Sequence, residues 1–148
     1  VLIKEIFENV FNQLNFQIEL YKPIIKLNFE KVSIININKA YIESIFLNLL
    51  TNAIKYKSES RKLKITITSQ EMDDTVVLIF KDNGIGIDLE RNRDKVFGLY
   101  QRFHNYPDSK GLGLYLVKSQ VETMGGTIEI ESEVNKGTTF TLTFKNKQ

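Results

Sequence analysis

The stretch "KDNGIGID", residues 81–88, follows an apolar run and admits two interpretations. Asn83-Gly84 is typical of a tight hairpin turn, which requires a second strand directly afterwards. The sequence that follows, "DLERNRDKVFGLYQRF", is charged and does not alternate, so it favours a loop with a short helical part near "KVFGLYQRF". We therefore interpret 81–88 as a ligand-binding segment. Asp82 can accept a hydrogen bond from an amino group such as that of adenine, and Gly84 and Gly86 would let a flat base approach the backbone.

The surrounding patterns predict a single domain over residues 1–148. One apolar helical stripe runs through 2–21, a second helix begins after the capping residue Asn38, and a third spans 112–124 before Gly125-Gly126. Strands are predicted at 22–30, at 63–68 and 75–80 around "EMDD", and in "TIEIES" and "TTFTLTF" around "VNKG". Together they indicate an α+β fold: a two-layer α/β sandwich with a mixed, mostly antiparallel sheet, three main helices on one face, and a lid between the second and third helices.

The composition excludes several classes of protein. Apolar residues make up 42% and charged residues 26%, which is enough for a sizeable core. The net charge of +2 predicts no nucleic-acid partner. The chain contains no cysteine, so disulfides, thiolate metal sites and thiol catalysis are excluded. It begins with Val1 directly in a helical pattern, and we expect it to be a piece of a longer protein.

The second helix, "SIFLNLLTNAIKY" (44–56), carries an unusual polar face. Asn48, Asn52 and Lys55 recur at i, i+4 and i+7, beside the apolar stripe. Amide oxygens are hard ligands that can hold Mg²⁺, and the lysine can meet phosphate charge. The alternative is that these residues simply occupy the solvated side of the helix.

A third polar feature lies in "SKGLGLYLV" (109–117), where Gly111 and Gly113 stand at the start of a helix. Helix N-termini with little side-chain cover offer N–H groups to phosphates. The alternative is a flexible loop that enters a core helix, since Leu112, Leu116 and Val117 look core-like. The spacing is not that of a P-loop or a dinucleotide-binding fingerprint.

These motifs, in this order, resemble the catalytic ATP-binding domain of sensor histidine kinases, within the GHKL (Bergerat-fold) superfamily of DNA gyrase and MutL-type ATPases. "NLLTNAIKY" resembles the asparagine box, "DNGIG" and "KGLGL" the two glycine boxes, "KVFGLYQRF" the phenylalanine box and "KGTTF" (136–140) the last motif. The resemblance covers nearly the whole chain.

The resemblance implies a role for each matching residue, with ATP and Mg²⁺ as cofactors. The metal ligands would be Asn52 and Asn48, and catalysis would depend on Asn48, Lys55 and Arg102, the last a lid arginine that reaches the γ-phosphate. Asp82 would bind the adenine amino group, with Thr138 assisting through a water. The remaining residues of the ATP site would be Lys55 and Tyr56 at the phosphates or ribose, Gly111, Leu112, Gly113 and Leu114 at the triphosphate, and Gly84, Gly86, Ile87 and Phe103.

The position of Asn48 favours phosphoryl transfer over hydrolysis. ATPases of the superfamily carry a glutamate there, one helical turn before the metal-binding asparagine, to activate water. An amide cannot accept that proton. His104, the only histidine of the chain, lacks the sequence context of a phosphoacceptor, so we expect the acceptor histidine on a separate dimerisation domain.

The leading interpretation is therefore the catalytic domain of a two-component histidine kinase, monomeric by itself, cytoplasmic, with a response regulator downstream. The resemblance leaves open whether the parent protein is anchored in a membrane. Two alternatives are an anti-sigma-type serine kinase and a degenerate nucleotide-binding module that serves only in interactions.

Overall fold

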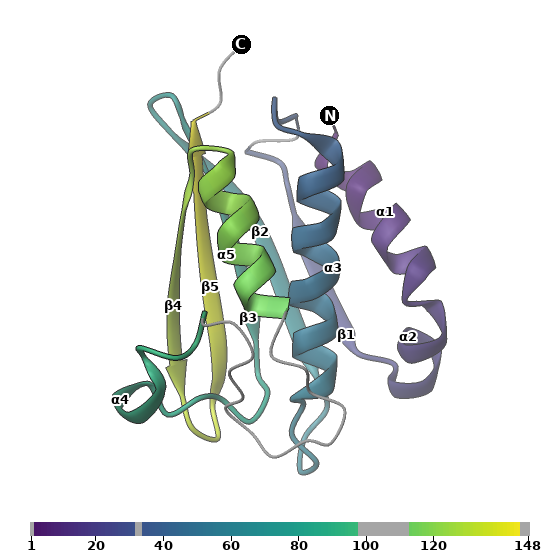
Figure 1. Cartoon of the computed structure of the whole chain (residues 1–148). Coiled ribbons are helices and arrows are strands. Elements are labelled where there is room, and N and C mark those ends of the chain that lie inside the picture. Colours follow the sequence, from purple (N-terminus) through teal and green to yellow (C-terminus); the bar gives the residue numbers. More distant parts are fainter. Residues whose placement is uncertain (1, 32–33, 98–112, 146–148) are drawn as a thin grey trace.

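The computed structural model describes residues 2–31, 34–97 and 113–145. Figure 1 shows helices gathered on one face of a single sheet, which confirms the predicted two-layer sandwich. The helices are α1 (Ile3–Gln13), α2 (Asn15–Tyr21), α3 (Lys39–Lys55), α4 (Leu89–Asn92) and α5 (Gly113–Thr123). The strands are β1 (Ile24–Asn28), β2 (Lys64–Met72), β3 (Thr75–Asp82), β4 (Thr127–Glu133) and β5 (Gly137–Lys145).

The sheet has the order β1-β2-β3-β5-β4. Only β1 and β2 are parallel among these pairs, and the other neighbours are antiparallel, as predicted for a mostly antiparallel sheet. The turn between β2 and β3 is two residues long, with Asp73 in the left-handed region at φ 56°. The β4–β5 turn falls at the predicted "VNKG", with Asn135 at φ 67°.

The inward face of the sheet is apolar along most of its length and polar at one end. On β3, the buried Leu78 and Phe80 are followed on the same face by Asp82. The register places Asp82 opposite Thr138 of β5, and Thr138 opposite Ser132 of β4. Asp82 and two polar side chains of the β4–β5 hairpin, about 50 residues further along the chain, therefore form one row across the sheet.

Aromatic packing fixes the helices over this face. The ring centroids of Phe7 on α1 and Phe46 on α3 lie 4.9 Å apart, and those of Phe46 and Phe80 on β3 lie 5.0 Å apart. Both Phe7 and Phe46 are fully buried. Such pairs add about 0.5–1.5 kcal/mol each beyond the burial of their area, so α1, α3 and the sheet form one rigid unit.

Helix α3 begins where the sequence predicts. Asn38 Oδ1 accepts a hydrogen bond from the backbone N–H of Tyr41 at 3.1 Å, a cap that contributes about 1 kcal/mol. The predicted apolar stripe of this helix is buried along its whole length: Ile42, Ile45, Phe46, Leu49, Leu50, Ala53 and Ile54.

The N-terminal segment departs from the prediction of one helix over 2–21. The helix is interrupted at Leu14, which is buried but has φ −103° and ψ 15°. None of the residues of α2 is buried, and Phe16 and Leu20 on it are exposed. The interruption keeps Leu14 in the core while it redirects the chain toward β1. Pro23 then follows the left-handed Lys22 that ends α2.

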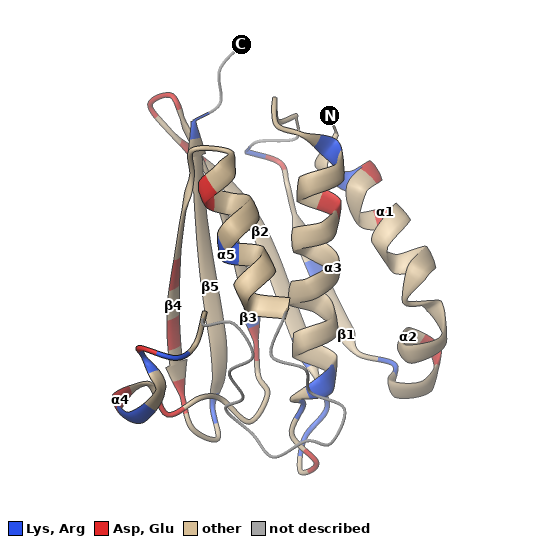
Figure 2. Cartoon of the chain, in the orientation of Figure 1, with Lys and Arg blue, Asp and Glu red and all other residues tan. Residues whose placement is uncertain are grey.

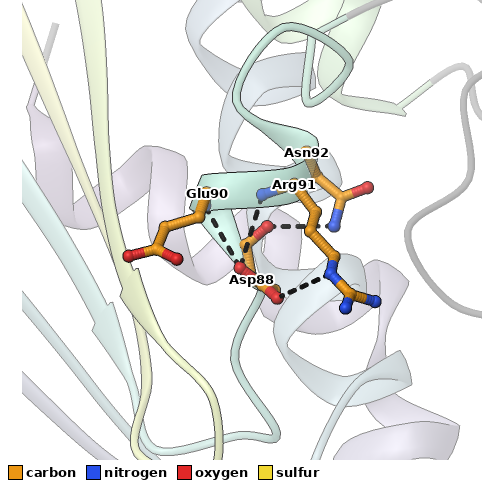
Figure 3. A network of polar contacts seen from close by, with 4 residues as sticks. All are labelled: Asp88, Glu90, Arg91 and Asn92. Atoms are coloured by element: carbon orange, nitrogen blue, oxygen red, sulfur yellow. Dashed lines mark hydrogen bonds and ion pairs between the residues drawn. The ribbon is translucent and has the colours of Figure 1, made fainter.

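The short helix α4, at Leu89–Asn92, was not predicted. Of the helical stretch that we expected near residues 95–103, residues 95–97 form a turn and residues 98–103 lie outside the described residues. Figure 3 shows why α4 forms: the Asp88 carboxylate accepts hydrogen bonds from the backbone N–H groups of Glu90 and Arg91, and Asn92 Nδ2 donates to the Asp88 carbonyl. The remainder of the predicted lid, residues 98–112, lies outside the described residues.

Helix α5 ends near the predicted glycine pair, where Gly125 has φ 77°. Val117 is buried as predicted, but Leu116 is 42% exposed, so its assignment to the core is wrong. The buried stripe of α5 consists of Leu114, Val117 and Val121, at spacings of three and four. Leu116 falls outside that stripe.

The edge strand β4 carries an acidic stripe, seen in red in Figure 2. Glu129, Glu131 and Glu133 alternate on its exposed side. Charged side chains on an edge strand oppose pairing with another chain, so this stripe has a structural explanation. Within the described part of the chain, no helix is both long and apolar enough to cross a bilayer.

Candidate functional site

The Asp82 carboxylate stands at the polar end of the inward face, half-buried at the end of β3. Burial raises its pKa to about 6, although hydrogen bonds from the backbone N–H groups of Gly84 and Thr138 and the nearby charge of Arg61 lower it. The Gly84 bond to Oδ1 is 2.8 Å long. Above pH 6 the group is therefore a desolvated, acceptor-only carboxylate, as expected of a residue that binds an amino group.

Arg61 binds the backbone of the segment that follows Asp82, and we did not predict this role from the sequence. Its Nε donates to the carbonyl of Asn83 at 2.7 Å, and its Nη2 donates to the carbonyl of Gly84 at 2.6 Å. One planar guanidinium thus holds two successive carbonyls and brings positive charge near Asp82. A lone arginine in the polar loop "SESRK" gives no sequence signal for this role.

Asn83 explains why the segment is not a hairpin. Its side chain accepts a hydrogen bond from the backbone N–H of Lys64 at 2.8 Å and donates to the carbonyl of Lys62 at 2.9 Å. The asparagine therefore extends the pairing between β3 and β2 rather than turning the chain back. The prediction that 81–88 is not a hairpin is confirmed.

The glycines of the segment are needed for a different reason from the one expected. A Cβ on Gly84 would lie 2.5 Å from the carbonyl oxygen of Tyr56, at the end of α3. A Cβ on Gly86, at φ 75°, would overlap the carbonyl of Glu133. These positions face the protein's own backbone, so the glycines let the segment pack between α3 and the β4–β5 turn. The backbone N–H of Ile85 donates to the Tyr56 carbonyl at 2.9 Å, which secures this packing.

Ser132 is a second residue missed from the sequence. Its hydroxyl accepts from the backbone N–H of Ile87 at 2.7 Å and lies 2.9 Å from the Gly137 carbonyl and 2.8 Å from Thr138 Oγ1. The signal was present in "TIEIES": Ser132 falls in the apolar phase of the strand after Ile128 and Ile130. A polar residue in that phase indicates a buried polar partner.

The polar face of α3 lies next to the N-terminus of α5. Asn48 Nδ2 donates to the Ser44 carbonyl at 3.0 Å, so the amide nitrogen is used within the helix. Its Oδ1 lies 3.6 Å from where a Cβ of Gly113 would be, at the start of α5. Asn48 and Asn52 are both half-buried, one helical turn apart. Two amide oxygens on one face suit a hard cation such as Mg²⁺.

Lys55 and Tyr56 complete the end of α3. Lys55 is half-buried and also borders a hollow of about 260 Å³ whose lining includes Leu14, Gln17 and Tyr21. The Tyr56 carbonyl contacts the 82–87 segment, as described above. The structure therefore places Asn48, Asn52 and Lys55 on α3, and Tyr56, the residue that ends this helix, contacts the 82–87 segment.

At the N-terminus of α5, Gly113 faces Asn48 and the Leu114 side chain is buried. Leu114 can therefore offer only its backbone to a ligand. Four further predicted residues lie outside the described part of the chain: Arg102, Phe103, Gly111 and Leu112. His104 also lies there.

Solved structures of histidine kinase catalytic domains share this fold. The nucleotide-free catalytic domain of ThkA superposes with a TM-score of 0.81 at 24% identity, over 99% of this chain and 93% of that chain. Full-length ShkA in complex with AMPPNP gives a TM-score of 0.81 at 21% identity, over 99% of this chain and 31% of that chain.

Curated relatives are sensor proteins considerably longer than this chain. The heme sensor protein HssS of Staphylococcus saprophyticus is 32% identical over 145 residues, covering 98% of this chain and 31% of the relative. The sensor protein RprX of Bacteroides fragilis is 35% identical over 143 residues, covering 93% of this chain and 27% of the relative. The chain thus spans less than a third of the length of these relatives.

The sequence pattern of one ATPase family matches residues 38–148, from the cap of α3 to the end of the chain. That range contains the asparagine face of α3, the Asp82 segment, the α5 N-terminus and the Asp82–Thr138–Ser132 row. The chain belongs to the family of histidine kinase-, DNA gyrase B- and HSP90-like ATPases.

Proposed function

We propose that this domain binds Mg-ATP and transfers the γ-phosphate to a histidine on a separate dimerisation domain of a two-component sensor kinase. The observation that carries the proposal is the meeting of three features around one region. These are the desolvated Asp82 carboxylate, the amide face of α3 and the N-terminus of α5. AMPPNP, the ligand of the full-length ShkA complex, is an ATP analogue, which supports the same ligand class here.

Each part of the nucleotide has a matching group. The Asp82 carboxylate would accept from the adenine amino group, with Thr138 beside it. The oxygens of Asn52 and Asn48 would hold Mg²⁺, which when bound neutralises phosphate charge. Lys55 would add positive charge, and the backbone N–H groups at Gly113 and Leu114 would face the triphosphate. The assigned roles of Arg102, Phe103, Gly111 and Leu112 rest on the motif alone.

Transfer rather than hydrolysis follows from the chemistry of Asn48. Its amide nitrogen donates to the Ser44 carbonyl, and its oxygen has no basicity at neutral pH. No carboxylate stands at this position to activate water. Orientation and charge neutralisation, which phosphoryl transfer needs most, do not require a base there.

The proposed partners are those of two-component systems. A phosphohistidine formed on the dimerisation domain would pass its phosphoryl group to a response regulator, as in the two-component systems to which the resemblance points. We place the domain in the cytoplasm, where ATP is available, and expect it to be monomeric by itself.

The test is a transfer assay with γ-labelled ATP. The domain alone should incorporate no label, whereas addition of a dimerisation domain that carries its histidine should produce a labelled, acid-labile phosphohistidine. His104→Ala should change neither result. Label that appears on the isolated domain and disappears in His104→Ala would contradict the proposal, and failure to bind ATP at all would favour a degenerate interaction module.

A further inference from the structure

The Ser132 hydroxyl makes three polar contacts, and they account for its full hydrogen-bonding capacity. A serine hydroxyl has one proton to donate and two lone pairs that accept. Here its neighbours are the Ile87 N–H at 2.7 Å, the Gly137 carbonyl at 2.9 Å and Thr138 Oγ1 at 2.8 Å.

The direction of each bond can be assigned from what each partner is able to do. The Ile87 N–H can only donate, so it occupies one lone pair of Ser132. The Gly137 carbonyl can only accept, so it must receive the Ser132 proton; otherwise two acceptors would face each other at 2.9 Å. The remaining contact is then completed by Thr138, whose hydroxyl proton goes to the second lone pair of Ser132.

This assignment determines what Thr138 can offer to a ligand. Its hydroxyl proton is directed at Ser132, so both lone pairs of Oγ1 stay available, and no other side-chain partner of Oγ1 is found among the described residues. Thr138 lies opposite Asp82 in the β3–β5 register. The two side chains that would meet the edge of a purine base, those of Asp82 and Thr138, therefore present only hydrogen-bond acceptors.

We propose that Ser132 is a positioning residue that contributes to the base specificity of the nucleotide site. It holds Thr138 as a hydrogen-bond acceptor, so that the site prefers 6-amino purine nucleotides over 6-oxo ones. This inference rests on the proposed function, because it concerns the same nucleotide.

The chemistry of the two bases explains the preference. Adenine presents an amino group at C6, which donates to the carboxylate directly and to Thr138 directly or through a water. Hypoxanthine presents a carbonyl at C6, which would meet acceptors only. If Ser132 were removed, the Thr138 hydroxyl could rotate and donate to that carbonyl, so one of the two features that reject a 6-oxo purine would be lost.

The experiment compares the affinities of Mg-ATP and Mg-ITP for the full chain by titration calorimetry. The measured quantity is the ratio of the ITP dissociation constant to the ATP dissociation constant. In Ser132→Ala this ratio should fall roughly three- to tenfold, the worth of one hydrogen bond. A loss of affinity common to both nucleotides, such as that caused by the unpaired Ile87 N–H, cancels in the ratio.

Three further variants separate specificity from a general effect on folding. Ser69→Ala removes another buried hydroxyl from the inward face of the same sheet, away from Asp82, and should leave the ratio unchanged. Ser132→Cys fills nearly the same space with a weak hydrogen-bonding group, so it should lower the ratio even if the alanine variant fails to fold. In a Thr138→Val background, Ser132→Ala should have no additional effect on the ratio.

The outcomes distinguish this inference from the proposed function. A ratio that is unchanged in both Ser132 variants, with ATP still bound, would overturn the inference and leave the proposed function standing. A ratio that falls equally in Ser69→Ala would also overturn it. Absence of ATP binding to the unaltered chain would overturn both.

Discussion

Replacement of Asp82 by asparagine should stabilise the ligand-free domain while it weakens adenine-nucleotide binding. Burial raises the pKa of Asp82 from 3.8 to about 6, which means that the folded state disfavours the charged form. Each pKa unit corresponds to about 1.36 kcal/mol, so ionisation of Asp82 costs the fold up to about 3 kcal/mol above pH 6. Because the side chain is only half-buried, we expect a gain of about 1–3 kcal/mol for the neutral amide at pH 7.5.

The sign of the pH dependence follows from proton binding. Between pH 3.8 and about 6 the folded state binds more protons at Asp82 than the unfolded state does, so this residue makes stability fall as the pH rises through that window. The difference between Asp82→Asn and the unaltered domain should be small at pH 4 and fully developed above pH 7. At about 2–4 °C for each kcal/mol, Tm should increase by roughly 2–12 °C at pH 7.5.

Affinity should change in the opposite direction. An amide can turn its NH₂ toward the adenine amine, and the lost charge-assisted bond is worth about 1.5–3 kcal/mol, or roughly 10- to 150-fold in Kd. The assays are thermal unfolding at pH 4.5 and 7.5 without ligand, and ATP titration at pH 7.5. A Tm gain of the same size at both pH values, or no gain at pH 7.5, would refute the assignment of a raised pKa. Unchanged ATP affinity would show that Asp82 does not bind the base.

Three other substitutions test the backbone packing, the charge next to Asp82 and the proposed metal ligand. Gly137→Ala should destabilise the fold by about 2–4 kcal/mol in urea unfolding, because the φ of Gly137 is 132° and a Cβ would overlap the Asp82 carbonyl. The control Gly125→Ala, at φ 77° with no atom within 4 Å of the added Cβ, should cost only about 1 kcal/mol. Equal costs for the two variants would contradict the packing described. Arg61→Ala should weaken ATP binding about tenfold and move the pH midpoint of binding upward, because the charge that lowers the Asp82 pKa is removed. The measurement is a series of ATP titrations at different pH values. An unmoved midpoint would show that the Arg61 charge does not affect the Asp82 carboxylate. Asn52→Ala should strongly reduce the Mg²⁺ dependence of ATP affinity, because only Asn48 of the two proposed ligands remains, and should leave affinity in EDTA nearly unchanged. A Mg²⁺ effect of undiminished size would exclude Asn52 as a ligand.

Local patterns in the sequence were sufficient for much of the fold. The cap at Asn38, the apolar periodicity of α3, the glycine end of α5 and the turn at "VNKG" are each patterns within a short stretch of sequence. Short-range chemistry of this kind can be inferred without knowledge of the rest of the chain. The motif order likewise indicated the ATPase family, which the family match confirms.

Tertiary structure alone decided how the site is built. The row of Asp82, Thr138 and Ser132 exists because the β3–β5 and β4–β5 registers align positions up to 56 residues apart, and a shift of one residue would turn these side chains to the other face. The Arg61 contacts with two carbonyls depend likewise on a long-range approach between a loop and the 82–87 segment.

The glycines show the same division between sequence and structure. Their presence in "DNGIG" was enough to indicate a special backbone, but not which atoms occupy the space that a Cβ would fill. Only the packed structure identifies these as the carbonyls of Tyr56 and Glu133. The sequence by itself therefore determined the family and most of the elements, because these follow from local periodicity and motif spacing, though not the break at Leu14 or the short helix α4. The proton directions and the carboxylate pKa at the site come from long-range packing, which sets burial and hydrogen-bond partners that no local pattern contains.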